Sequence, residues 1–148
     1  MKTLIVEDDF TSRLLLQAFL SAFGECDVAA NGNEAIDLFR MAQRSGAPYD
    51  LICMDILMPE MDGHTAVKTI RALGERRLVP PHHTRIIMTT SLSDRENVAR
   101  SINELCDAYL IKPVDTGKLL NQLKSFGLLQ AEPSPQVPEA TENYTSES

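Results

Sequence analysis

The sequence predicts an α/β fold in which one parallel sheet is covered by helices on both faces. Five short apolar runs of strand length alternate with longer segments whose apolar residues recur at helical spacing. Strict alternation of this kind is typical of parallel sheets, because each crossover between parallel strands needs a connecting helix. The strands are continuous apolar runs, as expected where both faces of a sheet are buried, so we predict helices on both sides.

The first half of the chain supplies two strands and two helices. Residues 4–6 and 26–30 are the predicted strands. The helix between them ends at Gly24, and the helix that follows the second strand has Asn33 as its predicted N-cap. Helical spacing assigns the buried faces of the two helices to Leu15, Ala18, Phe19 and Ala22, and to Ala35, Leu38, Phe39 and Ala42.

The second half continues the alternation. Further strands are predicted at residues 51–54, 85–90 and 108–111, and a helix follows each of them. The last two of these helices begin at Asp94 and Asp115. The expected apolar faces of the three helices are Ala66, Val67, Ile70 and Leu73; Val98, Ile102 and Leu105; and Leu119, Leu120, Leu123 and Phe126.

Composition narrows the classes of function. At 148 residues the chain is long enough for one domain with a sizeable core. The net charge of −7 argues against a surface that binds nucleic acid, because a polyanion repels an acidic protein. No apolar run approaches the roughly 20 residues that cross a bilayer, and the short apolar run at the N-terminus does not fit a signal peptide. We therefore expect a cytoplasmic protein with no membrane and no nucleic-acid partner.

The end of the chain and the cysteines add two expectations. Residues 130–148 contain three Pro, four Glu and neither Lys nor Arg, so we predict a disordered acidic tail after a domain at residues 1–129. Cys26, Cys53 and Cys106 are odd in number. We interpret them as small buried apolar residues of a reducing compartment, and not as a disulfide framework or a metal site.

Polar side chains are predicted to gather at one edge of the sheet. In an open α/β sheet, ligands bind beyond the carboxyl ends of the strands. The residues delivered there are Glu7, Asp8, Asp9, Asp55, Thr89, Thr90, Ser91 and Lys112. Clustered carboxylates raise at least one pKa unless a cation lies among them, and oxygen ligands suit Mg²⁺. With a Lys and a Thr hydroxyl for phosphate oxygens, the edge predicts a Mg²⁺-dependent phosphoryl site whose nucleophile is Asp55.

Four segments of the chain closely resemble the receiver domain of two-component response regulators. They are VEDD (6–9), MDILMPEMDG (54–63), TTS (89–91) and YLIKP (109–113), and they occur in the family's order. The resemblance covers about residues 3–128 and implies a doubly wound, flavodoxin-like sheet with strand order 2-1-3-4-5. In this family an Asp accepts a phosphoryl group from a kinase phosphohistidine, and the matching residue is Asp55.

The resemblance also implies roles for individual residues. The acidic pair that binds Mg²⁺ corresponds to Glu7 and Asp8, which leaves Asp9 as an N-cap for the first helix. The other implied roles are phosphoacceptor and metal ligand for Asp55, metal binding through the backbone carbonyl for Leu57, phosphoryl binding for Thr90 and Lys112, a conformational switch for Thr90 and Tyr109, and a cis peptide before Pro113.

Ordinary structural roles stay open for several of these polar residues. Glu7 and Asp8 could be a polar strand end, and Asp62 and Gly63 fit turn chemistry. Thr89 should face packing, because alternate residues of a strand point to opposite faces. The basic residues of the loop before the fourth strand, and at its start, are expected to be solvated: Arg76, Arg77, His82, His83 and Arg85.

The expected function is that of a stand-alone response regulator, with no enzyme activity beyond weak self-dephosphorylation. It would take phosphate from a histidine kinase or a histidine phosphotransfer protein, and signal through its fourth helix, fifth strand and fifth helix. In receiver domains the positions of Leu57 and Leu92 flank the path of the hydrolytic water and are often polar, so the resemblance implies slow dephosphorylation for this chain. The alternatives are a small Mg²⁺-dependent phosphohydrolase and a receiver-like interaction module. Turnover of a phosphate ester would favour the hydrolase, and a stable acyl phosphate on Asp55 the regulator.

Overall fold

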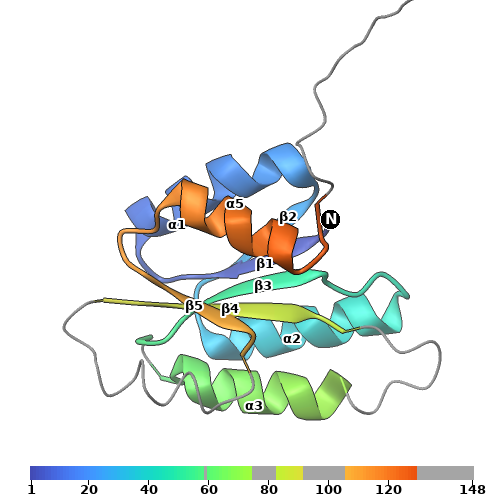
Figure 1. The fold of residues 1–148 in the computed structure, drawn as a ribbon. Helices are drawn as coiled ribbons and strands as arrows, with labels where there is room; N and C mark the ends of the chain where they lie inside the picture. The colour runs from blue at the N-terminus through green and yellow to red at the C-terminus, as the bar shows by residue number, and fades with distance from the viewer. Residues whose placement is uncertain (59, 75–82, 92–105, 130–148) are drawn as a thin grey trace, which may run out of the picture.

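A five-stranded parallel sheet forms the centre of the computed structural model, which describes residues 1–58, 60–74, 83–91 and 106–129 (Figure 1). The strands are β1 (Thr3–Val6), β2 (Cys26–Ala29), β3 (Leu51–Asp55), β4 (Arg85–Thr90) and β5 (Ala108–Ile111). Their order in the sheet is β2-β1-β3-β4-β5, and all neighbours run parallel. The predicted α/β class and the strand order implied by the resemblance are therefore confirmed.

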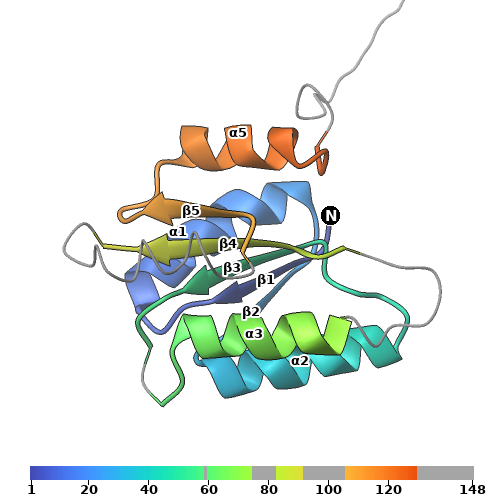
Figure 2. The same ribbon diagram turned by 60° about the horizontal axis from the view of Figure 1, so that its bottom comes forward.

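Helices cover both faces of the sheet. They are α1 (Phe10–Leu20), continued by the 3₁₀ turn η1 (Ser21–Phe23), then α2 (Gly32–Arg44), α3 (Gly63–Gly74) and α5 (Thr116–Ser125). Figures 1 and 2 show α1 and α5 on one face of the sheet and α2 and α3 on the other. Within the described ranges, no helix has the length and apolar character of a membrane span. The fourth helix predicted from Asp94 and the tail predicted at residues 130–148 fall outside the described residues.

Alternate strand residues face two separate cores. On β1, Leu4 and Val6 pack in the core that contains α2 and α3, whereas Ile5 packs in the core that contains α1 and α5. The first four residues of β3 alternate between the same two cores, and Asp55, the fifth, is buried at the end of the strand. This double burial explains why the strands read as continuous apolar runs. Each fully buried aliphatic side chain contributes roughly 1.5–3 kcal/mol to the stability of the fold.

The cysteines are free thiols, as predicted. Cys53 is buried in the core, but Cys26 and Cys106 are only half-buried. Cys106 also lies just before β5 and not inside a strand or helix. The expectation that all three are buried core residues is therefore wrong for two of them.

The buried face of α1 differs from the predicted one. The structure buries Leu16 and Leu20, while Leu15 and Ala18 are exposed. The helix carries apolar residues on nearly every side, and its only charged residue is Arg13, so helical spacing fits more than one face. Part of the apolar surface that the sequence placed in the core is therefore exposed to solvent.

Side-chain caps set the helix starts. Asp9 caps α1, as predicted. In α2 the N-cap is Asn31 and not Asn33, and its side chain accepts from the Glu34 N–H at 2.9 Å. The Glu34 carboxylate in turn accepts from the Ala30 N–H at 2.8 Å. These two hydrogen bonds fix the start of α2 at Asn31. A cap at Asn33 would have no Glu three residues later to accept a hydrogen bond from the backbone. A side-chain cap contributes about 1 kcal/mol to stability.

Candidate functional site

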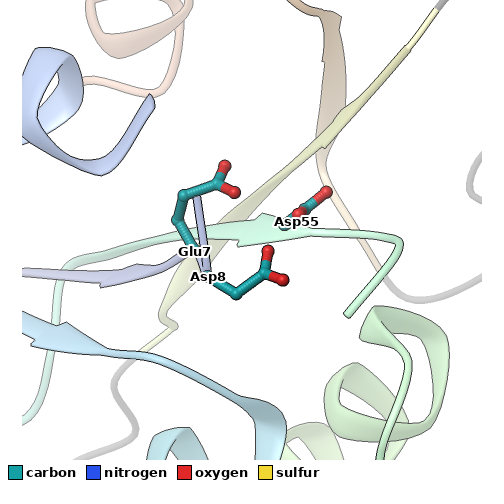
Figure 3. Close-up of side chains that lie close together, drawn as sticks. All are labelled: Glu7, Asp8 and Asp55. Carbon is teal, nitrogen blue, oxygen red and sulfur yellow. The ribbon is translucent and has the colours of Figure 1, made fainter. Parts of the chain in front are cut away.

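Three acidic side chains meet at the carboxyl edge of the sheet, as the strand order predicted. Glu7 and Asp8 follow β1 and Asp55 ends β3, and these two strands are neighbours. One carboxylate oxygen of each side chain lies within 4.8 Å of the other two. Figure 3 shows the three side chains gathered at the ends of the two strands. A compact set of oxygen donors is typical of a site for a hard divalent cation.

The three acids differ in their access to solvent. Glu7 is fully buried and Asp55 nearly so, whereas Asp8 is exposed. The Asp9 N–H donates to Glu7 Oε2 at 3.1 Å, and Arg13 Nη1 donates to the Glu7 carbonyl at 3.2 Å. The inner side of the site is therefore held by hydrogen bonds, and its outer side is open at Asp8.

Lys112 adds an ammonium group to the site. Its Nζ lies 2.8 Å from Glu7 Oε1 and 3.2 Å from Asp55 Oδ2. Burial alone would lower the pKa of Lys112, but the hydrogen bond to Glu7 and the charges of Asp55 and Glu7 raise it overall, so the amine stays protonated. Its backbone N–H donates to the Thr90 carbonyl at 2.6 Å, which ties the loop after β5 to the end of β4. The Lys112–Pro113 peptide is cis, as the resemblance implied.

Asp55 is an acid whose charge is incompletely compensated. Burial raises the pKa of Asp55, the charge of Glu7 raises it further, and Lys112 offsets only part of this, which places the pKa at about 7. Three carboxylates beside one ammonium leave a formal charge of −2 at this edge. A divalent cation would balance that charge, and Mg²⁺ prefers oxygen ligands. The residues present therefore fit a Mg²⁺ ion.

The remaining predicted residues lie around this cluster. Leu57 follows β3, and its backbone N–H donates to Asp55 Oδ1 at 3.3 Å. Thr90 is buried at the end of β4, and Tyr109 is half-buried on β5. The structure thus places Leu57, Thr90 and Tyr109 on the strands and loop that form the site. The metal role of the Leu57 carbonyl and the switch role of Tyr109 stay predictions.

Exposed apolar side chains on α1, the helix that follows Glu7 and Asp8, were missed in the sequence. Phe10 is 65% exposed and Leu14, four residues further along α1, is 53% exposed. Leu57, two residues after Asp55, is 56% exposed. The signal was present in α1, because a helix with apolar residues on all sides is either buried all round or contacts a partner.

A second charged cluster, before β5, was also not predicted. The Asp107 carboxylate accepts from Arg71 Nη2 at 2.8 Å and from the Ile86 N–H at 2.8 Å. His83 and Arg85 approach its other oxygen at 3.4 Å. His83 is exposed, as expected for a solvated loop, but the contacts of His83 and Arg85 with Asp107 were not predicted. Outside the described residues lie Arg76, Arg77 and His82.

Comparison with known sequences agrees with this geometry. The response regulator receiver domain family matches residues 3–124. The two-component response regulator ORR41 of Oryza sativa subsp. japonica is 36% identical over 131 residues, which are 86% of this chain and 95% of that protein. The hybrid signal transduction histidine kinase B of Dictyostelium discoideum is 36% identical over 82% of this chain, which spans only 6% of that kinase. Relatives thus include both short regulators and parts of much longer kinases.

Solved structures share the fold. The receiver domain of the sensor histidine kinase PA1611 from Pseudomonas aeruginosa PAO1, which has a magnesium ion coordinated in its active site cleft, matches with a TM-score of 0.68 and 27% identity over 84% of this chain and 95% of that chain. The co-crystal structure of the Saccharomyces cerevisiae histidine phosphotransfer protein Ypd1 and the receiver domain of Ssk1 matches with a TM-score of 0.70 and 27% identity over 91% and 94%. With the family match over most of its length, this chain belongs to the response regulator receiver domain family.

Proposed function

We propose that this chain accepts a phosphoryl group on Asp55 from the phosphohistidine of a histidine kinase or a histidine phosphotransfer protein. The observation that carries the proposal is the acidic cluster, in which Glu7, Asp8 and Asp55 converge and Lys112 contacts two of them. The resulting acyl phosphate would be the signal of a response regulator in the cytoplasm. Beyond forming and slowly losing this phosphate, the chain would not act as an enzyme.

Asp55 is the nucleophile of the proposed transfer. A carboxylate oxygen attacks the phosphorus, a P–O bond forms as the P–N bond breaks, and the electron pair leaves on the imidazole nitrogen. The ring departs as neutral imidazole when its other nitrogen carries a proton. Lys112, 3.2 Å from Asp55 Oδ2, is close enough to pair with the transferred phosphoryl oxygens. Thr90, at the end of β4, is the proposed hydroxyl donor to the same oxygens.

Mg²⁺ is the proposed cofactor of the transfer. Glu7, Asp8 and Asp55 would hold it through carboxylate oxygens, and Leu57 through its backbone carbonyl. When bound, the ion would neutralise charge on the phosphoryl oxygens. The PA1611 receiver domain, with its magnesium ion in the active site cleft, supports this assignment.

The exposed apolar side chains beside the site support a protein as the phosphoryl donor. Phe10, Leu14 and Leu57 are each more than half exposed, and their contact with a partner would remove apolar surface from water. A small phosphate compound would gain nothing from them. The crystallised pair of Ypd1 and the Ssk1 receiver domain is consistent with a phosphotransfer protein in this role.

Downstream contacts are proposed for β5 and α5, together with the helix predicted from Asp94. Tyr109 on β5 and Thr90 on β4 would report the state of Asp55 to these elements by shifting between two conformations. The fourth helix lies outside the described residues.

Leu57 supports a long-lived phosphoryl group. Its exposed side chain follows Asp55 by two residues and offers no polar atom to orient a hydrolytic water. We expect slow loss of phosphate in the wild type and faster loss in Leu57→Asn, measured by the decay of the phosphorylated mass after removal of the donor. Rapid decay in the wild type that Leu57→Asn does not increase would contradict this. The second position of this prediction, Leu92, lies outside the described residues.

Phosphorylation by acetyl phosphate tests the proposed function. In the presence of Mg²⁺, the wild type should gain the mass of one phosphate, and Asp55→Asn should gain none. Asp37→Asn is the matched control, because Asp37 is an exposed acid on α2 and its variant should gain phosphate like the wild type. An unphosphorylated wild type, or a phosphorylated Asp55→Asn variant, would overturn the proposal.

Two phosphate donors, p-nitrophenyl phosphate and acetyl phosphate, distinguish the proposed regulator from the two alternative functions. A phosphohydrolase would turn over p-nitrophenyl phosphate continuously, whereas the proposed regulator gains one phosphate and releases no steady product. An interaction module would take no phosphate from acetyl phosphate at any Mg²⁺ concentration. The acidic cluster and its contact with Lys112 support the proposal over a pure interaction module, which would not need them.

A further inference from the structure

Gly63, the first residue of α3, lies directly against the main chain of Asp55. A Cβ atom on Gly63 would lie 2.5 Å from the Asp55 carbonyl oxygen and 3.0 Å from the Ile56 Cα, and 2.9 Å from the Met88 Cε. Contacts under 3.0 Å do not occur between a real Cβ and its neighbours, so something would have to shift. Gly63 is not among the glycines with positive φ, so the requirement here is space and not backbone conformation.

The two main-chain atoms decide what would have to move. The Met88 methyl is the end of a flexible side chain and could turn away at little cost. The Asp55 carbonyl and the Ile56 Cα have no such freedom. The Ile56 N–H donates to the Thr89 carbonyl of β4 at 3.0 Å, and the Ile56 carbonyl accepts from the Gly63 N–H at 2.8 Å. The end of β3 is thus held between β4 and the start of α3.

A second glycine contacts the same loop from another helix. A Cβ on Gly32, the first residue of α2, would lie 3.0 Å from the Met61 Sδ and 3.2 Å from its Cγ. Met61 belongs to the loop between β3 and α3 that also contains Leu57. A third contact, with the Ala66 Cβ of α3, would be 3.3 Å long. Because the two shortest contacts are with the flexible Met61 side chain and none is under 3.0 Å, a methyl group on Gly32 should displace the loop less than one on Gly63.

We propose that Gly63 is a positioning residue of the phosphoryl site. Because glycine has no side chain, Asp55 and the loop after it can occupy the positions seen in the structure. This inference rests on the proposed function and goes beyond the turn chemistry expected for Gly63. Moving the end of β3 would change the 3.2 Å contact between Asp55 and Lys112 and the 3.3 Å contact between Asp55 and the Leu57 N–H. Mg²⁺ requires ligands at about 2.0–2.1 Å in near-octahedral geometry, so a shift of a few tenths of an ångström would weaken its binding.

The test compares Gly63→Ala with Gly74→Ala at the other end of the same helix. A Cβ on Gly74 would meet only the Phe39 Cζ, at 4.0 Å, which is ordinary contact. Mg²⁺ and Ca²⁺ dissociation constants are measured by calorimetry, and folding by circular dichroism. Ca²⁺ tolerates longer and less regular coordination than Mg²⁺. We expect Gly63→Ala to weaken Mg²⁺ binding by about tenfold and Ca²⁺ binding clearly less, and Gly74→Ala to leave both unchanged.

The outcomes separate a positioning role from a purely structural one. If Gly63→Ala only lowers the unfolding temperature and leaves the Mg²⁺-to-Ca²⁺ preference at its wild-type value, the inference is overturned. If Gly63→Ala does not fold, Gly32→Ala is measured in its place. A loss of Mg²⁺ affinity relative to Ca²⁺ that is smaller than the roughly tenfold loss expected for Gly63→Ala supports the inference. Wild-type affinities for both ions overturn it. A wild type that neither binds Mg²⁺ nor gains phosphate would instead contradict the proposed function itself.

Discussion

Two aspartates of the same sheet have opposite electrostatic surroundings. Asp55 ends β3 at the carboxyl edge, where it shares one ammonium with Glu7, and burial raises its pKa to about 7. Asp107 lies at the opposite edge of the sheet, directly before the start of β5. Arg71 and the Ile86 N–H donate to its carboxylate at 2.8 Å. Burial also acts to raise the pKa of Asp107, but the Ile86 hydrogen bond and the Arg71 charge outweigh it and lower the pKa overall.

The difference separates an acid whose charge is compensated inside the fold from an acid whose charge is left incompletely compensated, as expected for the proposed phosphoacceptor. The oxygens of Asp107 are taken up by protein donors, so its charge is compensated without any bound ion. Asp55 and Glu7 together face one ammonium, so their charge is compensated only in part. A strongly perturbed carboxylate of the second kind marks a functional site, because bound cations or phosphoryl chemistry complete it.

The largest expected effect is the loss of stability in Asp107→Ala. Removal of this carboxylate would leave the half-buried Arg71 and the Ile86 N–H without their partner, at a cost of about 2–4 kcal/mol in unfolding free energy. Urea unfolding measures it, with Asp37→Ala on the exposed side of α2 as the control. A cost below that of the control would show that the Asp107 cluster does not stabilise the fold.

The pH dependence of that cost follows from the lowered pKa. Folding lowers the pKa of Asp107 below its unfolded value of 3.8, so the stabilisation is fully present above pH 3.8 and is lost as the pH falls through the folded value. The difference in unfolding free energy between wild type and Asp107→Ala should therefore shrink on acidification below about pH 4. A difference that grows toward low pH would have the wrong sign.

Asp55→Asn should have the opposite effect on stability. The neutral amide removes an incompletely compensated buried charge beside Glu7, so the variant should be more stable than wild type by about 1–2 kcal/mol without Mg²⁺. Urea unfolding at pH 8 with a chelator present measures this gain. Asp55→Asn that unfolds more easily than wild type would show that the charge of Asp55 is compensated inside the protein.

Addition of Mg²⁺ should raise the unfolding free energy through the site around Asp55 and not through the cluster around Asp107. At ten times its dissociation constant, Mg²⁺ should raise the unfolding free energy of wild type by about 1.4 kcal/mol. Asp107→Ala should gain the same amount, because its site is at the far end of the sheet, and Asp55→Asn should gain much less. Equal gains in all three proteins would place the ion elsewhere.

The smallest expected effect distinguishes the cations around Asp107. Arg85 lies 3.4 Å from Asp107 and its side chain is 37% exposed, so Arg85→Ala should cost less than about 0.5 kcal/mol. Arg71 also donates to the Thr84 carbonyl and is far more buried, so Arg71→Ala should cost about 2 kcal/mol. Urea unfolding of the two variants compares them directly. Equal costs would mean that distance and burial do not rank these contacts.

The two ends of the sheet also differ in how far the sequence predicts them. At the carboxyl edge, parallel strands end side by side, so residues that follow the strands can be placed without further knowledge. This is why Glu7, Asp55 and Lys112 were predicted to meet. Asp107 could not be paired with Arg71, 36 residues away, because that contact depends on where the tertiary fold places α3 relative to the residues before β5.

Local patterns failed where several choices had similar support. In α1, the run Leu14–Leu16 fits more than one buried face, and packing against the sheet selected Leu16. In α2, Asn31 and Asn33 are both good caps, and the hydrogen bond from Ala30 to Glu34 selected the first. Gly63 was assigned to a turn, because a close approach to the Asp55 main chain leaves no trace in the sequence.

The central claim is that Asp55 is the phosphoacceptor, and chemical trapping tests it most directly. Borohydride reduces an aspartyl phosphate to homoserine, which peptide mass mapping locates along the chain. After treatment with acetyl phosphate and Mg²⁺, homoserine is expected at position 55, and none is expected there when Mg²⁺ is removed. Homoserine at another acid, or an unmodified position 55 in a protein that has gained phosphate, would contradict it.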